Sequence, residues 1–470
     1  MAAEARERED KYDLPPGWVF PGLDGIVPDG GRATSETVRM SSTYYDTAER
    51  DLLRHGLTLR RRSGERDAGW QLKVPEDGAR TEIRLPADAG RGVPKELRDL
   101  VAGVRMGAPL RVLARLDTER IVHSIVDAAG TVLAEIVEDH VVATTPGTEA
   151  PREWDEVEVE LVDGDEPVLA RARRVLTRAG AKPAKVGSKL VRALGPQDVV
   201  PARPNNLAGT VQTYLDEQYD AIVRGDLDLR RQRDVVHTTR VAIRRYRSVL
   251  RIFPIFDPRQ AETLDAELSW YAGVLGEVRD RQVLRTHLDG LVGELPDGVA
   301  RAALAARIDA ALDAEEAEAR RVLARAMAGS RYPSLLRTLR AWRDDPPLTP
   351  AADKPRKAVA THANAALRTV EKRLAKAHGK RGTDLDLHRA RKAAKRARYA
   401  FELAQPVLGK SAAAQVKALK KRQDELGLHQ DSVVAAEFLQ RLAARPAGDA
   451  TDFALGALWI REQDRINETR

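Results

Sequence analysis

The chain has 470 residues, with 78 Lys and Arg, 71 Asp and Glu, nine His and no Cys. The lack of cysteine excludes disulfides, thiolate metal sites, iron–sulfur clusters and cysteine nucleophiles, and no apolar run is long enough to cross a membrane. The first ten residues are charged and have no apolar signal segment, so a cytoplasmic protein is expected. Residues 1–200 carry a net charge of −5 and residues 201–470 a net charge of +12, which predicts an anionic partner for the second half.

Short runs of alternating polar and apolar residues dominate the first 195 residues. They are LTLRRR, WQLKVP, RTEIRLP, TVLAEIVED and WDEVEVEL. Such alternation, with Gly, Pro and Asp between the runs, is typical of strands. Several strands at this spacing predict an antiparallel sheet or barrel over residues 1–195. The Pro-rich stretch at residues 196–206 is then a linker.

The alternation also gathers charged side chains in rows on one face of each strand. The rows are Glu7, Glu9 and Lys11; Arg60 and Arg62; Lys73; Arg80 and Glu82; and Glu156, Glu158 and Glu160. One interpretation is a solvated sheet face with cross-strand ion pairs. The other is a lumen in which Arg and Lys hold phosphoryl oxygens and carboxylates hold Mg²⁺ or Mn²⁺. The row of three glutamates in the last of these runs favours the second interpretation, because like charges on one face need cations opposite them.

This ordered series of positions resembles the CYTH family, the triphosphate tunnel metalloenzymes. The motifs that carry the resemblance are Glu7-x-Glu9-x-Lys11, Tyr45-Asp46-Thr47, Leu59-Arg60-Arg61-Arg62, Lys73, Arg80-x-Glu82, Thr118-Glu119-Arg120, Glu135, Asp139, Glu156-x-Glu158-x-Glu160 and Ser188-Lys189. The resemblance covers about residues 5–195 and implies an antiparallel β-tunnel that binds a triphosphate with a divalent cation. Arg84 departs from the pattern, where an acid is expected.

The resemblance also implies a role for each row. The expected triphosphate-binding residues are Lys11, Arg60, Arg62, Lys73, Arg80, Glu82, Arg115, Arg120 and Lys189. The expected ligands of Mg²⁺ or Mn²⁺ are Glu7, Glu9, Asp139, Glu156, Glu158 and Glu160. The general base is expected among Glu156, Glu158 and Glu160, with no member singled out.

The expected reaction is hydrolysis of inorganic tripolyphosphate, because this substrate demands the fewest additional features. A nucleoside or thiamine triphosphate is an alternative substrate, and Trp18, Trp70 or Trp154 would then be candidates to stack on thiamine. The alternative from another functional class is a binding protein, which binds polyphosphate and whose tunnel has no catalytic activity.

From residue 207 to residue 470, Ala, Leu, Arg and Glu recur every three to four positions, which predicts an all-α domain. This domain repeats itself at an offset of 151 residues. The segment His237–Arg247 recurs as His388–Arg398, and Leu275-Gly276-x-x-x-Asp280 recurs as Leu426-Gly427-x-x-x-Asp431. The repeat predicts two related helical bundles about a pseudo-two-fold axis. The fold class is therefore multidomain α+β, with a β-tunnel followed by two helical bundles.

Each copy of the repeat places a histidine and several basic residues on one helical face, where an anion would relieve like-charge repulsion. Nearby Arg and Lys disfavour a metal, while the 4% aromatic content and the lack of a recognition motif disfavour nucleic acid. The repeat resembles the CHAD domain, the conserved-histidine α-helical domain, over about residues 205–470. This implies a basic surface for inorganic polyphosphate and an association with polyphosphate granules.

The residues expected to bind polyphosphate are His237, Arg240, Arg244, Arg245, Arg247, His388, Arg391, Lys395, Arg396 and Arg398. Two of them, Arg245 and Arg396, lie about 100° round the helix from their neighbours, so they either contact the polymer or brace the other side chains. Gly276 is expected at a close approach of helices, and Asp280 is expected to orient basic side chains.

Overall fold

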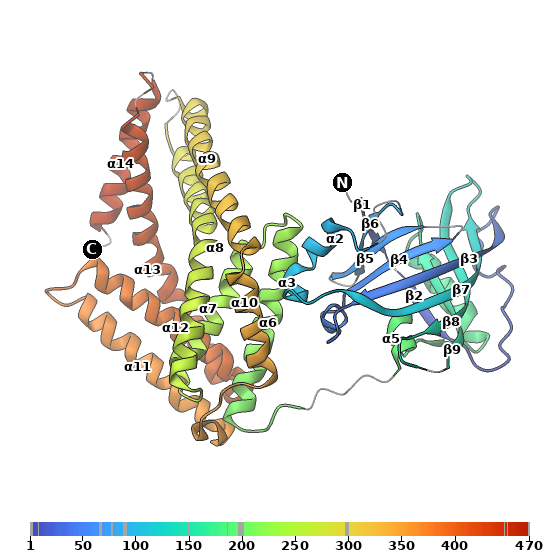
Figure 1. Cartoon of the computed structure of the whole chain (residues 1–470). Helices are drawn as coiled ribbons and strands as arrows, with labels where there is room; N and C mark the ends of the chain where they lie inside the picture. Colours follow the sequence, from blue (N-terminus) through green and yellow to red (C-terminus); the bar gives the residue numbers. More distant parts are fainter. Residues whose placement is uncertain are drawn as a thin grey trace. The chain divides into compact units, whose positions relative to one another are not determined.

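The computed structural model describes residues 3–7, 9–64, 68–76, 79–87, 92–148, 150–185, 187–195, 202–296, 300–445, 447–448 and 450–468. The chain forms two compact units, residues 1–200 and 201–470 (Figure 1). None of the helices in the described residues combines the length and the apolar character that a membrane span requires. The predicted fold class, an antiparallel sheet followed by a helical domain, is confirmed.

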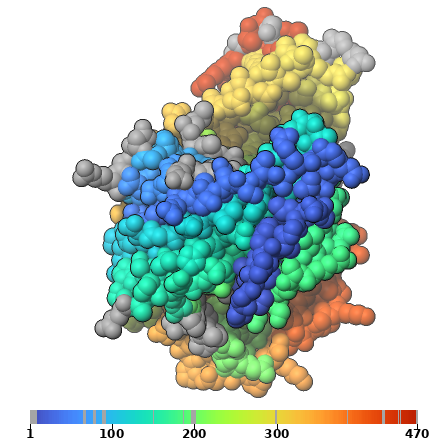
Figure 2. All heavy atoms as spheres, turned by 90° about the vertical axis from the view of Figure 1, so that its right-hand side faces the viewer, coloured from blue at the N-terminus to red at the C-terminus, as the bar shows by residue number. Residues whose placement is uncertain are grey.

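The N-terminal unit contains one sheet, whose ten described strands pair antiparallel in the order β1-β6-β5-β4-β3-β7-β8-β9-β2-β10. The strands are β1 Ala3–Glu7, β2 Glu9–Asp13, β3 Arg32–Asp46, β4 Thr58–Gly64, β5 Gly69–Glu76, β6 Ala79–Leu85, β7 Arg111–Val126, β8 Val132–Thr144, β9 Arg152–Leu161 and β10 Lys182–Pro183. Figure 2 shows the outer surface of this unit, where the blue and teal segments lie side by side, as the pairing of β3 with β7 requires.

The first two strands close this sheet on itself. Glu7 of β1 lies opposite Arg80 of β6, whereas Glu9 of β2 lies opposite Glu160 of β9. The predicted row Glu7, Glu9 and Lys11 thus pairs with β6 before residue 8 and with β9 after it. Because β1 and β2 follow one another in the chain, this segment joins the two sides of the sheet and completes a tunnel.

The two faces of the sheet have different surroundings. The outer face of β8 and β9 packs on the amphipathic helix α4 (Glu166–Arg178), where Ile136, Val157 and Val159 contact Leu169 and Leu176. The alternate residues of these strands point into the tunnel. Short helices also cover the sheet: α1 (Asp51–Arg54), α2 (Lys95–Leu100), α3 (Ala102–Arg105) and α5 (Lys189–Leu194).

The helix α5 enters the inner side of the sheet. Its Leu190 and Ala193 are buried against Leu116 of β7 and Val141 of β8. This packing carries Lys189, the first residue of the helix, to the end of the row of charged side chains.

The C-terminal unit is helical, and its helices follow the repeat. They are α6 Leu207–Arg230, α7 Val236–Ile252, α8 Pro258–Gly293, α9 Arg301–Ala328, α10 Arg331–Asp344, η1 Pro350–Asp353, η2 Arg356–Ala358, α11 Val359–Ala377, α12 Asp384–Leu408, α13 Lys410–Ala443 and α14 Ala450–Glu468. Moving α8 along the chain by 151 residues gives 409–444, which matches α13. The same shift relates α6 to α11, α7 to α12 and α9 to α14, so α10 is the α-helix of this unit without a counterpart in the described residues.

The two bundles meet in two places. The helices α7 and α12, which carry the repeated basic segment, pack against each other. Farther along, α8 and α9 share a core with α13 and α14, in which Leu288 and Leu304 lie with Leu439 and Leu458. The two predicted related bundles are therefore present, and the repeated basic segments lie where the bundles contact each other.

Candidate functional site

A polar cavity lies inside the sheet of the N-terminal unit. Among the residues that the structure describes, its lining comprises eight basic and three acidic side chains. The lining residues are Glu9, Lys11, Met40, Ser42, Tyr44, Thr58, Arg60, Arg62, Lys73, Arg80, Arg84, Leu116, Thr118, Arg120, Glu158, Glu160, Ser188 and Lys189. The strand rows identified in the sequence thus meet in one space. An inorganic polyanion together with a cation fits this balance of charge.

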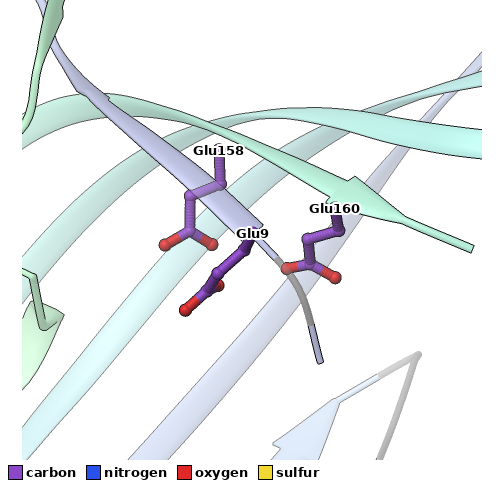
Figure 3. A group of neighbouring side chains, drawn as sticks. All are labelled: Glu9, Glu158 and Glu160. Carbon is purple, nitrogen blue, oxygen red and sulfur yellow. The ribbon is translucent and has the colours of Figure 1, made fainter. Parts of the chain in front are cut away.

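Three carboxylates form one wall of the cavity. Glu9 comes from β2, and Glu158 and Glu160 come from β9; one oxygen of each lies within 4.8 Å of the others. Figure 3 shows the three carboxylates turned toward the same space. Burial raises the pKa of Glu160, and the charges of Glu158 and Glu9 raise it further. Such crowding of carboxylates favours a bound cation.

Glu158 is nevertheless held ionised by its basic neighbours. Burial alone would raise the pKa of Glu158, but Lys11, Lys189 and Arg120 hold it well below its ordinary value. Lys11 donates to Glu158, and its Nζ also lies 3.2 Å from Oε2 of Glu9. Glu158 therefore connects the carboxylate wall to three cations.

A second group of carboxylates, Asp139, Glu156 and Glu158, also lies within 4.8 Å. The Nζ atom of Lys189 is 2.9 Å from Asp139, 2.5 Å from Glu156 and 2.7 Å from Glu158. Arg120 donates two hydrogen bonds of 2.7 Å to Asp139. Of the expected metal ligands, Asp139 and Glu156 therefore already neutralise cations of the protein.

Glu82 lies behind the opposite wall and is fully buried. Its carboxylate accepts a hydrogen bond from Arg84 and lies 3.6 Å from Arg60 and 4.0 Å from Lys73. Burial would raise the pKa of Glu82, but Lys73, Arg60 and Arg84 lower it. Glu82 thus orients three cations toward the cavity and does not itself line the cavity.

The expectation for Arg115 is wrong. Its side chain is 59% exposed and pairs with Asp117 on the outside of β7. Residues separated by five positions in a strand point to opposite faces, so Arg115 and the cavity residue Arg120 cannot share one. The side chain of Glu7 lies outside the described residues.

Sequence reasoning missed some residues of the lining. Tyr44 accepts a hydrogen bond of 3.2 Å from Nη1 of Arg60. Burial would raise the pKa of Tyr44, but Arg60 and Arg62 lower it. Arg84, noted in the sequence as a departure, lines the cavity as a further cation. Side chains alternate along a strand, so Ser42, two positions from Tyr44, and Thr118, two positions from Arg120, could have been placed on the inner face from the sequence.

The helical unit gathers a second set of cations where α7 contacts α12. Burial lowers the pKa of Lys395 to about 7, and Arg391, Arg244 and Arg240 add to this effect. The pKa of His237 is also lowered, by burial and by nearby arginines that include Arg279 of α8. We call these residues, with Arg398, the central basic cluster: His237, Arg240, Arg244, Arg279, Arg391, Lys395 and Arg398.

The central basic cluster lacks enough acidic partners of its own. Burial and the charges of Arg240, Arg398 and Arg391 lower the pKa of Arg244, with Tyr399 opposing them. The buried Nε atoms of Arg244 and Arg391 have no hydrogen-bond partner among the described residues. An anion would supply both the missing charge and the missing acceptors.

The repeated Leu-Gly-x-x-x-Asp segment seats one arginine of this cluster. Nη1 of Arg240 donates a hydrogen bond of 2.8 Å to Asp280. A Cβ atom on Gly276 would lie 2.9 Å from Nη2 of the same arginine. The glycine therefore leaves room for a guanidinium, and the aspartate fixes its direction.

Three of the predicted polyphosphate ligands, Arg245, Arg247 and Arg396, lie beside the cluster, and carboxylates pair with two of them. Arg247 donates a hydrogen bond of 2.9 Å to Asp265, and Arg245 donates one of 2.9 Å to Glu402. Arg398 lies 3.7 Å from the same Glu402, and Arg396 lies among other arginines. His388 is half-buried near the start of α12. The ten predicted side chains thus do not form a single uniform row.

Comparison with known proteins agrees with this division into two units. The CYTH domain model matches residues 29–193 and the CHAD domain model matches residues 213–440. Two uncharacterised proteins of Mycobacterium tuberculosis, from strains CDC 1551 and H37Rv, are 35% identical over 496 residues, which cover 99% of this chain and 94% of theirs. The chain belongs to the family of proteins that join a CYTH domain to a CHAD domain. CYTH proteins include triphosphatases and cyclases.

Two solved structures are similar to part of the chain. PptA from Streptomyces chartreusis is 24% identical, with a TM-score of 0.47, over 56% of this chain and 96% of that chain. The CHAD domain of the plant Ricinus communis is 27% identical, with a TM-score of 0.45, over 58% of this chain and 94% of that chain.

Proposed function

We propose that the CYTH domain hydrolyses inorganic triphosphate with Mg²⁺ or Mn²⁺, and that the CHAD domain binds inorganic polyphosphate. The observation that carries the first part is the lining of the cavity, in which eight cations face three carboxylates. Tyr44 is the aromatic residue among the described lining, and Arg60 already bonds its hydroxyl. The lining thus offers no evident stacking surface for a nucleobase or a thiamine ring.

The tryptophans considered for thiamine support the same choice of substrate. Trp18 packs beside the outer core of the sheet, and Trp70 is fully buried against Tyr45. Trp154 donates a hydrogen bond of 2.7 Å to Glu156. None of the three belongs to the described cavity lining.

The carboxylates Glu9, Glu158 and Glu160 fit a hard divalent cation, because all three donors are oxygens within 4.8 Å of one another. When bound, such a cation supplies positive charge against the phosphoryl oxygens of the substrate. Lys189 pairs with all three carboxylates of the second group but, in the first group, with Glu158, so the first group is the preferred site.

The protein side chains would then perform the remaining work. Arg60, Arg62 and Lys73 hold phosphoryl oxygens on the wall opposite the carboxylates, and they stabilise the charge that passes to the leaving diphosphate. A water would attack the terminal phosphorus in line. The side chain of Glu160 is 36% exposed and that of Glu158 only 3%, which favours Glu160 as the group that reaches this water.

The central basic cluster is the proposed polyphosphate site of the CHAD domain. Burial, together with repulsion from the neighbouring cations, lowers the pKa of Lys395 to about 7. A polyphosphate chain would replace this repulsion by charge-assisted hydrogen bonds. Binding of this kind would also hold the protein at polyphosphate deposits.

The test of catalysis is phosphate release by the full chain from tripolyphosphate, ATP and thiamine triphosphate, each with Mg²⁺, with Mn²⁺ and with EDTA. Release should depend on the metal and be fastest from tripolyphosphate. Glu158→Gln should abolish it, whereas Glu153→Gln, at a 64% exposed side chain of the same strand, should leave it near the wild-type rate. No release from any substrate, with polyphosphate binding intact, would identify a binding protein with an inactive tunnel.

A further inference from the structure

The two sides of the central basic cluster are related by the repeat but do not carry the same charges. Arginines at 245 and 247 in the first copy return as arginines at 396 and 398 in the second. The charge is reversed at one position of these two helices, because Arg251 of the first copy returns as Glu402. The repeat thus places opposite charges at equivalent points of α7 and α12.

On one side, which we call the Glu402 flank, arginines share an acid. Glu402 accepts hydrogen bonds of 2.9 Å from Arg245 and 3.3 Å from the hydroxyl of Tyr214. Nε of Arg398 lies 3.7 Å from the other oxygen of this carboxylate. Two guanidinium groups are therefore balanced by one carboxylate, and this carboxylate would repel a passing anion.

On the other side, which we call the Arg396 flank, cations are in larger excess. Arg247 and Arg251 both donate to Asp265, with Nε distances of 2.9 and 3.1 Å. Arg396 and Arg373 add two further guanidinium groups. Burial and the charges of Arg251, Arg373 and Arg247 lower the pKa of Arg396, and Asp265 opposes them.

Four arginines on the Arg396 flank thus face one aspartate. On the Glu402 flank two arginines share Glu402, and the adjoining pocket adds Arg203, Arg356 and Glu217, of which Arg203 pairs with Asp216, so acids balance cations more closely there. Both flanks continue directly from the central basic cluster, because Arg396 follows Lys395 on α12 and Arg245 follows Arg244 on α7. A long anion that fills the cluster would gain charge-assisted bonds on the first flank and meet a carboxylate on the second.

We propose that a polyphosphate chain leaves the central basic cluster over the Arg396 flank and not over the Glu402 flank. The CHAD domain would then bind a long chain asymmetrically, although its two bundles are repeats of each other. This inference rests on the proposed binding of polyphosphate, and it adds the direction in which the polymer runs.

The test compares two identical substitutions at equivalent positions of the repeat, both made in the full chain. Binding of long-chain polyphosphate is measured across a series of salt concentrations in EDTA. Arg396→Ala should weaken binding about tenfold and reduce the slope of affinity against salt by about one. Arg245→Ala should change the affinity by less than about twofold, because Glu402 already balances that arginine.

A second pair of variants tests the position at which the two copies differ. Glu402→Arg should strengthen the binding of long chains, since it gives the Glu402 flank the charge that the other flank has. Arg251→Glu should weaken it. Thermal unfolding of each variant shows whether the fold is retained. If Arg396→Ala does not fold, Glu402→Arg and Arg251→Glu decide whether the polymer follows the Arg396 flank.

The outcomes separate this inference from the proposed function. Equal losses in Arg396→Ala and Arg245→Ala, or a larger loss in Arg245→Ala, would overturn the asymmetric path while binding itself stands. A wild-type chain that does not bind polyphosphate would overturn the proposed function and the path together. Weakening confined to Arg396→Ala and Arg251→Glu would support the path.

Discussion

Lys189 offers the strongest test of how the tunnel is held together. Its ammonium group lies 2.9, 2.5 and 2.7 Å from Asp139, Glu156 and Glu158, and its side chain is only 11% exposed. Lys189→Met keeps the length of the side chain and removes the charge. The three carboxylates would then lose a partner that they share.

The magnitude follows from the partners that remain. Breaking a buried ion pair from one side costs about 3–5 kcal/mol. Arg120 stays on Asp139, and Lys11 stays on Glu158, so the lower end, about 3 kcal/mol, is expected. For a unit of this size the corresponding fall in Tm is about 6–12 °C.

The pH dependence should change in a defined direction. Burial would raise the pKa of Asp139, but Lys189 and Arg120 lower it. A carboxyl with a lowered pKa stabilises the fold at neutral pH and loses this contribution as pH falls through the lowered value. Without Lys189 the pKa of Asp139 should rise toward its unfolded value, so acidification should remove less stability and this loss should be complete at a higher pH.

The assay is thermal unfolding of the full chain, followed by circular dichroism with and without Mg²⁺. Lys189→Ala, which leaves space beside the carboxylates, should gain more from Mg²⁺ than the wild type does. A cation at about 100 times its Kd adds about 2.7 kcal/mol. Lys185→Met is the matched control, because Lys185 is exposed on the segment just before α5.

Two results would refute this reasoning. The first is a fall in Tm of less than about 2 °C in Lys189→Met, which would mean that the shared ammonium contributes little. The second is an equal fall in Lys185→Met, which would mean that any lost lysine charge on this segment has the same effect.

Further predictions concern single residues of both domains. Arg115→Ala should leave tripolyphosphate hydrolysis within about twofold of the wild type, because its side chain lies outside the cavity; a large loss would contradict this placement. Polyphosphate affinity should fall as pH rises through about 7, where Lys395 loses its proton; Lys395→Arg should flatten this dependence, and Lys392→Arg, at an exposed position of the same helix, should not. Gly276→Ala should weaken polyphosphate binding about fivefold by displacing the guanidinium beside it, whereas Gly273→Ala, which has free space around it, should not; equal effects would assign the loss to the helix and not to the guanidinium.

The inner face of the sheet could be predicted from the sequence, because side chains alternate strictly along a strand. Glu158 and Glu160 were placed together on this basis. The same parity would have excluded Arg115, which lies an odd number of positions from Arg120. The role of Lys189 could not be predicted in this way, since its position depends on how α5 packs within the sheet.

In the helical domain, too, the spacing along one helix could be predicted from the sequence, but the contacts between helices could not. The spacing of basic residues places Arg240, Arg244 and Arg247 on one face of a helix, and the repeat predicts a second such face. Which of these arginines remains available to a ligand depends on acids from other helices. Asp265 of α8 pairs with Arg247, and nothing in the spacing along α7 indicates that contact.

The closure of the sheet by β1 and β2 has a consequence for the synthesis of the protein. Glu9 of β2 pairs with Glu160 of β9, which is made about 150 residues later. At about 5–20 residues per second this interval lasts roughly ten seconds or more. During that time β2 has neither of its neighbouring strands, β9 and β10, and its alternating charges would protect it from pairing with other chains. Glu9, one of the residues proposed to hold the metal, would thus also help to keep β2 from aggregating until β9 is made.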